Sequence, residues 1–380
     1  MKIAIDASCL QINPYSGLSE VVQNLISELP FVENGNNFIW FYNYFRCKNQ
    51  VSKNFLHKSD KHSLRIPRRL INWLWKFDRS YFDFLLPKVD IYHSLHVQIP
   101  ASVKLKKVLT VHDCRYLANP YLYPKRAVNR YRELMTISLN RANMVVAVSN
   151  FTREELLTHF SISENRIKVI YNGFRPCCLD STEIKEKLKY LIKKHNLPNS
   201  YLLFIGVLEP RKNLVRLIEA LSILQKEIND IPNLVIVGTS VKQWAKSDEA
   251  KKAAYLGVLK HIHVVGMVEK KELYFIIKKS LGLCYPSLYE GFGFPPLEAM
   301  SLGVPVLAGR YSATQEVTGN AACMVDPINV NDIVRGLDKV IFDNEYRQKL
   351  IERGFKQIKN FSWRKAAEEY ISLYKEVISS

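Results

Sequence analysis

The sequence predicts an α/β protein built from two doubly wound domains, each with a parallel sheet. Short apolar runs alternate with amphipathic, helix-like stretches along the 380 residues. This alternation occurs in two series, which a polar and charged stretch around 176–200 separates. The apolar runs also lack the strict apolar–polar alternation of a half-exposed sheet. We therefore expect helices on both faces of each sheet.

The first series predicts an N-terminal domain over residues 1–180. Helical patterns at 17–29 and 126–141 lie between its apolar runs, and Ser149 or Asn150 is expected to cap a further helix. The runs that we interpret as strands are rich in β-branched and aromatic residues, and they lie at 2–6, 38–42, 90–94, 108–112, 144–149 and 168–172.

The second series predicts a C-terminal domain over residues 196–362, with glycines at the ends of several strands. The last helix, 363–380, is a candidate to cross back to the first domain. Ligands bind at the carboxyl ends of strands in such sheets, so two facing domains would form a deep cleft. The strands are expected at 201–206, 234–238, 263–266, 282–287, 304–309 and 322–325.

Composition excludes several classes of protein. Hydrophobic residues make up 47% and charged residues 24%, which excludes a disordered chain. No apolar run approaches the roughly 18–20 residues of a membrane span, and the chain opens directly into a strand-like run without a secretory signal. The seven cysteines contain no CxxC pair, so free thiols are expected. Together these features favour a cytoplasmic protein.

The net charge of +18 is concentrated in one region, because residues 46–107 carry 14 basic and 4 acidic side chains, an excess of +10. Such a stretch suits nucleic acid, an anionic membrane surface or a phosphate-bearing substrate, and it is equally compatible with a solvated surface. The segment 65–76 mixes cations with Trp73 and Trp75, which favours an anionic membrane surface. The alternative is that both tryptophans are core residues and the cations a solvated edge. No nucleic-acid-binding motif is present, so we expect no nucleic-acid partner.

Two cations after a predicted strand form the first candidate site. The chain has no GxGxxG, P-loop, HExxH, GxSxG or DxD motif. Without DxD, a sugar-nucleotide enzyme must neutralise diphosphate by other means. Arg211 and Lys212 are expected in the first turn of a helix, where cations oppose the helix dipole unless an anion binds. The alternative is a tolerated pair of surface cations.

Two carboxylates around a glycine-rich turn form the second candidate site. Gly291 and Gly293 permit close approach of the backbone to a ligand, and Pro295 follows at a helix start. Glu290 precedes this turn and Glu298 lies about one helical turn inside the helix. Two carboxylates that face one polar ligand suit the hydroxyls of a sugar and a ribose. The alternative is a pair of helix-capping acids.

Glu290 and Glu298 form an E-x7-E motif, and Glu-Pro-Arg-Lys-Asn occupies 209–213. With these motifs the chain resembles the retaining glycosyltransferases of family 4, which have the GT-B fold of two Rossmann-like domains. Within the family, the chain resembles bacterial mannosyltransferase-like members that build O-antigen and other cell-surface polysaccharides. Matching pieces cover essentially the whole chain: Ser-Gly-Leu at 16–18, Asp-Ile-Tyr-His at 90–93, Thr-Val-His-Asp at 110–113, Ala-Val-Ser at 147–149, Tyr-Asn-Gly at 171–173, Val-Gly-Met-Val at 265–268, Gly-Val-Pro at 303–305, Val-Asp-Pro at 325–327 and Phe-Ser-Trp at 361–363.

The resemblance implies a role for each matching site residue. Arg211 and Lys212 correspond to the pair that holds the donor diphosphate. Glu290 corresponds to the acid that faces the sugar hydroxyls, and Glu298 to the acid on the ribose. His112 corresponds to a histidine near the reacting centre. Further donor contacts are implied at Gly17, at Val268 beside the base, and at the amides of Phe292, Gly293 and Phe294.

One departure from the family concerns the first loop. Members of this type often have Gly-Ile-Gly-Arg-Tyr there, whereas this chain has Ser-Gly-Leu-Ser-Glu at 16–20 and lacks the arginine. The contacts that this arginine would make with phosphate and acceptor are therefore not carried over, whereas the donor contact at Gly17 is.

The resemblance also implies the reaction. A hexose would pass from a nucleoside diphosphate sugar, for which GDP-mannose is the best assignment, to a saccharide acceptor on a lipid carrier. The anomeric configuration would be retained, and no metal or other cofactor would be needed. The enzyme would lie in the cytoplasm, at the inner face of the plasma membrane if the basic region binds anionic lipid. A non-hydrolysing nucleotide-sugar epimerase, which shares the two-domain architecture, and a polyanion-binding module are the alternatives.

Overall fold

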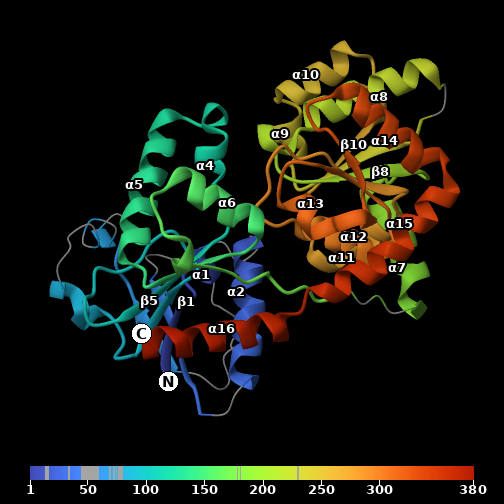
Figure 1. The fold of residues 1–380 in the computed structure, drawn as a ribbon. Coiled ribbons are helices and arrows are strands. Elements are labelled where there is room, and N and C mark those ends of the chain that lie inside the picture. The colour runs from blue at the N-terminus through green and yellow to red at the C-terminus, as the bar shows by residue number, and fades with distance from the viewer. Residues whose placement is uncertain are drawn as a thin grey trace. The chain divides into compact units, whose positions relative to one another are not determined.

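The computed structural model describes residues 1–12, 17–32, 35–43, 60–67, 70–71, 73, 75, 80–177, 179, 181–228 and 231–380. It divides into two compact units, residues 1–173 with 361–380, and residues 174–360. Each unit contains one sheet of parallel strands with helices packed on its faces (Figure 1). The predicted class, α/β with two doubly wound Rossmann-like domains, is confirmed.

Over its described residues, the first unit has a seven-stranded sheet in the order β3-β2-β1-β4-β5-β6-β7. All six strands expected from the sequence are present, with ends that differ by up to three residues. The seventh strand, β3, was not predicted because its sequence Asp-Lys-His-Ser-Leu is mostly polar, as an edge strand permits. The strands are β1 (Lys2–Asp6), β2 (Asn37–Asn43), β3 (Asp60–Leu64), β4 (Ile91–Ser94), β5 (Lys106–Val111), β6 (Met144–Ala147) and β7 (Ile167–Val169).

The helices that the sequence predicts in the first unit begin and end close to the predicted positions. Ser149 caps α6, since its hydroxyl accepts a hydrogen bond of 3.1 Å from the Thr152 amide. In the part of this unit that the structure describes, the α-helices are α1 (Cys9–Ile12), α2 (Gly17–Glu28), α4 (Arg115–Ala118), α5 (Lys125–Arg141), α6 (Asn150–His159) and α16 (Trp363–Ser379). The short 3-10 helices described there are η1 (Leu29–Phe31), η3 (Ser80–Leu85), η4 (Pro120–Leu122) and η5 (Glu164–Arg166).

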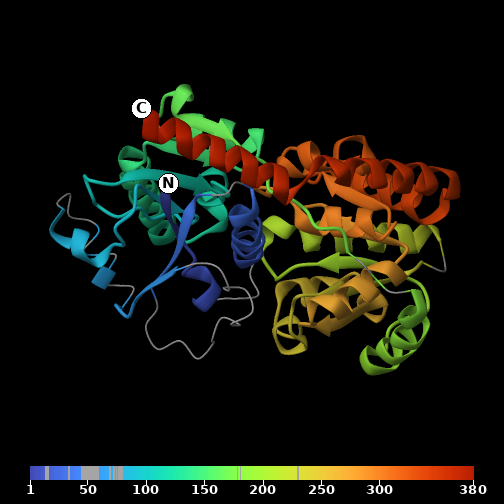
Figure 2. The same cartoon turned by 90° about the horizontal axis from the view of Figure 1, so that it is seen from below.

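The last helix, α16, belongs to the first unit and lies beside α2 in both views (Figures 1 and 2). A buried polar chain fixes it to the sheet. The Tyr374 hydroxyl lies 2.7 Å from Nδ1 of His93, whose Nε2 lies 2.8 Å from the Thr110 hydroxyl. Complete burial lowers the pKa of His93 to about 3, so this imidazole stays neutral and can accept as well as donate.

The second unit has a six-stranded sheet in the order β10-β9-β8-β11-β12-β13. All six strands predicted for it are present. The polar stretch between the two series contains α7, which belongs to this unit. The strands are β8 (Tyr201–Ile205), β9 (Asn233–Val237), β10 (Ile262–Gly266), β11 (Gly282–Tyr285), β12 (Val306–Gly309) and β13 (Cys323–Val325).

The helices of the second unit form two layers. In Figure 1, α8, α10 and α14 pack together on one side of the sheet and α11, α12 and α13 on the other. The α-helices are α7 (Ser181–His195), α8 (Leu214–Glu227), α9 (Val241–Trp244), α10 (Asp248–Tyr255), α11 (Lys270–Lys279), α12 (Phe294–Ser301), α13 (Ala313–Thr318), α14 (Val330–Phe342) and α15 (Asn344–Gln357). The 3-10 helices are η6 (Pro210–Lys212), η7 (Leu259–His261), η8 (Gly319–Ala321) and η9 (Ile358–Asn360).

The strand order in each unit reverses direction next to the first strand of that unit. In the second unit, β8 lies between β9 and β11, so the connections that follow β8 and β11 leave toward opposite faces of the sheet. Ligands of doubly wound sheets bind at this switch point, outside the carboxyl ends of the strands. A ligand site is therefore expected at the segments that follow β8 and β11.

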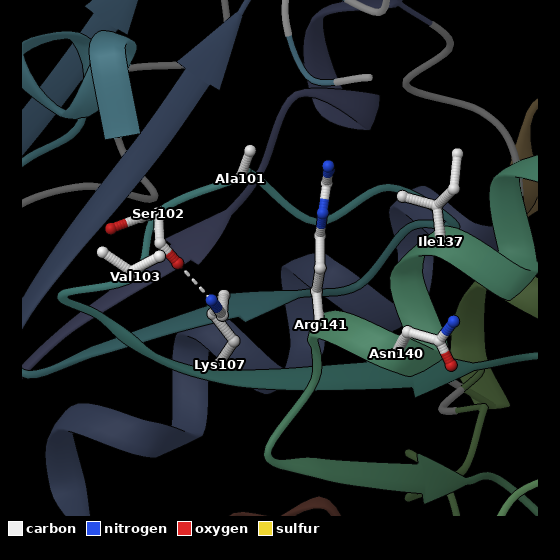
Figure 3. A pocket seen from close by; sticks show the side chains of 7 residues that line it. All are labelled: Ala101, Ser102, Val103, Lys107, Ile137, Asn140 and Arg141. Atoms are coloured by element: carbon white, nitrogen blue, oxygen red, sulfur yellow. Dashed lines mark hydrogen bonds between the residues drawn. The ribbon is translucent and has the colours of Figure 1, made fainter. Parts of the chain in front are cut away.

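A pocket of about 400 Å³ lies at the opposite, amino edge of the first sheet, where β5 begins and α5 ends. Figure 3 shows Lys107 donating to the carbonyl of Ser102, with Arg141 beside it. None of the predicted site residues lines this pocket. Its lining residues are Ala101, Ser102, Val103, Lys107, Ile137, Asn140 and Arg141.

Among the described residues, no helix combines the length and the apolar character that crossing a bilayer requires. The cysteines in the described part of the chain are free thiols, as predicted; they are Cys9, Cys114, Cys177, Cys284 and Cys323.

Candidate active site

Two segments of the second unit meet at the carboxyl edge of its sheet, one after β8 and one after β11. The Leu288 amide donates to the carbonyl of Arg211 at 2.7 Å. The side-chain amide of Asn213 donates to the carbonyls of Pro286 at 3.0 Å and Pro327 at 2.6 Å. These bonds place the Arg-Lys pair beside the segment that carries Glu290.

Arg211 and Lys212 do not lie in the first turn of α8, so that expectation was wrong. They lie in the short 3-10 helix η6 (Pro210–Lys212), and α8 begins only at Leu214. Asn213 lies between η6 and α8. Its backbone is left-handed at φ 62°, a conformation that asparagine tolerates better than most residues. The turn directs Lys212 into the protein, where only 8% of the residue is exposed. The alternative of a surface pair is excluded for Lys212.

Glu290 joins the two cations in one buried cluster. Its Oε1 lies 2.7 Å from Nζ of Lys212, and its Oε2 lies 2.9 Å from a terminal guanidinium nitrogen of Arg211. Nε of Arg211 also donates to Glu209 at 2.7 Å. Lys212 donates to the hydroxyl of Tyr285 at 2.7 Å. The structure thus brings three of the predicted site residues into direct contact.

Charge within this cluster keeps Glu290 ionised. Burial alone would raise the pKa of Glu290, but Lys212 and Arg211 outweigh burial and lower that pKa to about 2. Burial lowers the pKa of Lys212, and Glu290 opposes this effect by stabilising the ammonium form. An arginine fork and a lysine ammonium held side by side are the groups that proteins use to bind phosphate oxygens.

Glu298 has a different cation partner. It lies in α12, is only 5% exposed, and its Oε1 is 3.2 Å from Nζ of Lys270 at the start of α11. Gly293 precedes α12 with φ 115°, a conformation that a residue with a side chain rarely adopts. Proline lies at the start of α12, as predicted. The turn at Phe292, Gly293 and Phe294 therefore connects two separately paired glutamates.

Val268 lies at the same carboxyl edge of the sheet, two residues after β10, and it is half-buried. A residue at this edge can contact a ligand that binds at the carboxyl ends of the strands. Gly17, in contrast, is the first residue of α2 in the first unit. A methyl group added at Gly17 would meet no atom within 4 Å, and the preceding Ser16 lies outside the described residues.

His112 also belongs to the first unit, at the carboxyl end of β5. The predicted strand included His112, whereas the observed strand ends at Val111. Nε2 of His112 lies 3.2 Å from the carbonyl oxygen of Leu95. A carbonyl only accepts, so Nε2 carries the proton. Burial lowers the pKa of His112, which Asp113 partly offsets, so the ring is neutral at pH 7 with Nδ1 as its acceptor.

Sequence reasoning did not identify Glu209, Tyr285 and Lys270 as members of these clusters. Glu209 lies in the Glu-Pro-Arg-Lys-Asn motif and Tyr285 is the last residue of β11, so motif membership and position at a strand end were available signals. Lys270 gave no signal, because its partner lies in another helix and in a distant part of the sequence.

Comparison with known proteins decides the family. Residues 16–176 match the family model described as Glycosyltransferase Family 4, and residues 180–357 match the model described as Glycosyl transferases group 1. This chain belongs to the family 4 glycosyltransferases. It is 31% identical over 300 residues to the O-antigen chain mannosyltransferase B of Escherichia coli, a match that covers 78% of this chain and 75% of that protein.

Two further proteins show how far this glycosyltransferase resembles its relatives. It is 27% identical over 297 residues to the serotype-specific mannosyltransferase WbdA of Escherichia coli, covering 76% of this chain but only 36% of WbdA. Among solved structures, Anabaena HepE in complex with UDP and glucose matches with a TM-score of 0.72 and 16% identity, covering 99% of this chain and 100% of HepE. The latter likeness shows a shared fold, which is GT-B, as predicted.

Proposed function

We propose that this glycosyltransferase moves a mannosyl residue from GDP-mannose to a lipid-linked saccharide acceptor, with retention, during synthesis of O-antigen or another cell-surface polysaccharide. The observation that carries the choice of sugar is the 31% identity to an O-antigen chain mannosyltransferase over about three quarters of both chains. GDP is the nucleotide expected with mannose.

The buried cluster of the second unit supports the donor-binding part of the proposal. Arg211 and Lys212 would hold the diphosphate, and an arginine with five donors and a lysine with three can serve Glu290 and phosphate oxygens together. Glu298 would accept bonds from the ribose hydroxyls, and Val268 would border the base. The amides of residues 292–294, at the start of α12, add donors for the anion.

The proposed reaction needs no metal ion, because Arg211 and Lys212 supply the positive charge. As the bond between the anomeric carbon and the β-phosphate oxygen breaks, its electron pair passes to that oxygen, and the two cations stabilise the new charge. The sugar becomes oxocarbenium-like. The acceptor hydroxyl attacks on the same face, and its proton passes to the departing phosphate. Configuration at the anomeric carbon is thereby retained.

Glu290 would bind the sugar of the donor, and the family resemblance assigns a further sugar contact to His112 of the first unit. Glu290 is ionised and oriented by two cations, so it is suited to accept a hydrogen bond from a hydroxyl group of the sugar. His112 is neutral with its proton on Nε2, so its Nδ1 is suited to accept a second such bond.

A donor panel tests this proposal. Thermal unfolding is followed with GDP-mannose, UDP-glucose, UDP-GlcNAc and UDP-galactose, because a ligand at roughly 100-fold excess over its Kd adds about 2.7 kcal/mol of stability. We expect the largest shift from GDP-mannose. Nuclear magnetic resonance of the glycosidic product then reports the anomeric configuration. No shift with any of the four donors, or an inverted product, would refute the corresponding part of the proposal.

We also propose that the basic N-terminal region holds the enzyme on an anionic membrane surface. Trp73 is 55% exposed and Phe84 is 77% exposed, which supports a contact with lipid, whereas Trp75 is only 8% exposed and packs in the core with Phe41 and Tyr92. Cations near an anionic surface contribute about 1 kcal/mol each. Arg68, Arg69 and Lys76 lie outside the described residues, as does the side chain of Phe82.

Vesicle co-sedimentation tests the membrane proposal. Binding should require anionic lipid, weaken toward roughly 0.5 M salt, and fall when Trp73 becomes Ser or when Arg65, Arg68 and Arg69 become Ser. Tyr255→Ser is the matched control, since Tyr255 is 86% exposed in the second unit. Equal recovery with neutral and anionic vesicles, or none with either, would refute the membrane proposal and leave the transferase assignment intact.

A further inference from the structure

Glu298 and Lys270 form an ion pair between two helices of the second unit. The Glu298 side chain is 7% exposed and the Lys270 side chain 43%, and Nζ of Lys270 lies 3.2 Å from Oε1 of Glu298. The same ammonium lies 5.8 Å from the centre of the Tyr274 ring, one helical turn further along α11. The Lys270 ammonium therefore lies near the Tyr274 ring of its own helix and contacts a carboxylate of α12 that is almost completely buried.

The burial of Glu298 makes the position of this cation important. A carboxylate taken out of water is costly unless a countercharge and hydrogen bonds compensate for the loss of solvation. Lys270 supplies a countercharge while it remains partly solvated itself. An ion pair also fixes one carboxylate oxygen, and this limits the directions from which other donors can approach the group.

Lys270 is also linked to two parts of the proposed donor site, to one by sequence and to the other by contact. It lies two residues after Val268, which would border the base, and it contacts the acid that would bind the ribose. Both segments lie at the carboxyl edge of the sheet, since α11 follows β10 and α12 follows β11. A nucleoside at this edge would have its ribose next to the pair.

We propose that Lys270 is a positioning residue for the ribose of the donor. It holds Glu298 as an oriented carboxylate, so that the ribose hydroxyls donate to a group already fixed by folding. The inference rests on the proposed function, because it takes a nucleoside diphosphate as the ligand. Ribose contacts are made in the ground state and the transition state alike, so Lys270 contributes to the KM for donor and leaves kcat nearly unchanged.

The test compares ribose and dideoxyribose ligands by isothermal titration calorimetry. The probes are GDP and UDP, each with its 2′,3′-dideoxy counterpart, which lacks both hydroxyls. The variants are Lys270→Met, the charge-conserving Lys270→Arg, and Lys271→Met as matched control, because Lys271 is exposed on the same helix. Thermal unfolding of each variant checks that it is folded.

We expect Lys270→Met to weaken binding of the preferred ribose ligand about tenfold, as loss of a bond to a charged group does. Binding of the dideoxy ligand should hardly change, Lys270→Arg should recover most of the affinity, and Lys271→Met should behave as wild type. With saturating donor, kcat of Lys270→Met should stay within about twofold of wild type.

Three results would overturn the inference. If Lys270→Met binds the ribose ligand as tightly as wild type, the lysine does not position Glu298 for ribose. If Lys270→Met loses affinity for both ligands equally, or fails to fold while Lys270→Arg folds without recovering the preference for ribose, its role is structural. If wild type binds neither GDP nor UDP, the proposed function fails, and the inference fails with it.

Discussion

Nζ of Lys212 lies 2.7 Å from Oε1 of Glu290, and both residues are 8% exposed. Arg211 contacts the other oxygen of the same carboxylate. Folding therefore fixes the positions of the two cations proposed for the diphosphate. Cations that are oriented before the reaction need no reorganisation when charge develops on the leaving group, which is how such groups accelerate a reaction.

Lys212→Met should destabilise the protein, contrary to what a helix-start cation would predict. The substitution leaves Glu290 buried with Arg211 alone, and loss of one partner of a buried ion pair costs about 3–5 kcal/mol. Urea unfolding measures the change. Lys226→Met is the matched control, since Lys226 is exposed on α8 and should leave the midpoint unchanged. An unaltered midpoint for Lys212→Met would show that the pair is not formed.

Arg211→Ala should reduce kcat/KM strongly. Loss of one donor that stabilises a developing charge costs on the order of 2–4 kcal/mol in the transition state, or about 30- to 10³-fold in rate. Arg335→Ala serves as control, because Arg335 is 73% exposed on the same unit, where it pairs with Asp332. Near-normal turnover by Arg211→Ala would show that this residue does not stabilise the leaving group.

Glu290→Gln and Glu298→Gln should affect different kinetic constants. Glu298→Gln should mainly raise the KM for donor. Glu298 is proposed to bind the ribose, and ribose contacts are equal in the ground and transition states. Glu290→Gln should mainly lower kcat, since Glu290 is proposed to face the sugar whose charge changes. Steady-state kinetics over a range of donor concentrations separates the two constants. The reverse pattern would mean that the two roles are exchanged.

Acid should destabilise wild type more than Glu290→Gln. The pKa of Glu290 in the folded protein is about 2, against an ordinary value of 4.5. A lowered pKa contributes stability above the unfolded value, and this contribution is lost as pH falls from about 4.5 to about 2. Urea unfolding at stepped pH measures the loss, which should be a few kcal/mol. Equal slopes for wild type and Glu290→Gln in that window would contradict the ion-pair assignment.

The sequence predicted the sheets well because each buried strand is a compact apolar run. Edge strand β3, with the mostly polar residues 60–64, has no such run and could not be recognised. The motifs also pointed to Arg211 and Lys212, but not to their environment. Whether Lys212 points outward or inward depends on the left-handed backbone of Asn213 and on its bonds to Pro286 and Pro327.

Residue spacing in the sequence could not predict which side chains of distant segments form ion pairs in the candidate site. Glu290 and Glu298 are eight residues apart, a spacing that predicts one ligand for both but gives no sign that each has its own cation partner. The sequence does not identify Lys270 as the partner of Glu298, because the two meet only where α11 packs against α12. Trp73 and Trp75 likewise have similar surroundings in sequence, but only Trp75 enters the core.

The central claim is that this glycosyltransferase moves a hexose from a sugar nucleotide with Arg211 and Lys212 in place of a metal ion. The most direct measurement is transfer from GDP-mannose to mannose-terminated, lipid-linked oligosaccharides in the presence of EDTA, followed by mass spectrometry of the product and assay of released GDP. We expect an acceptor longer by one hexose, one GDP released for each transfer, and a rate that the chelator does not change. Complete loss of transfer with EDTA and its recovery with Mg²⁺ or Mn²⁺ would contradict the claim.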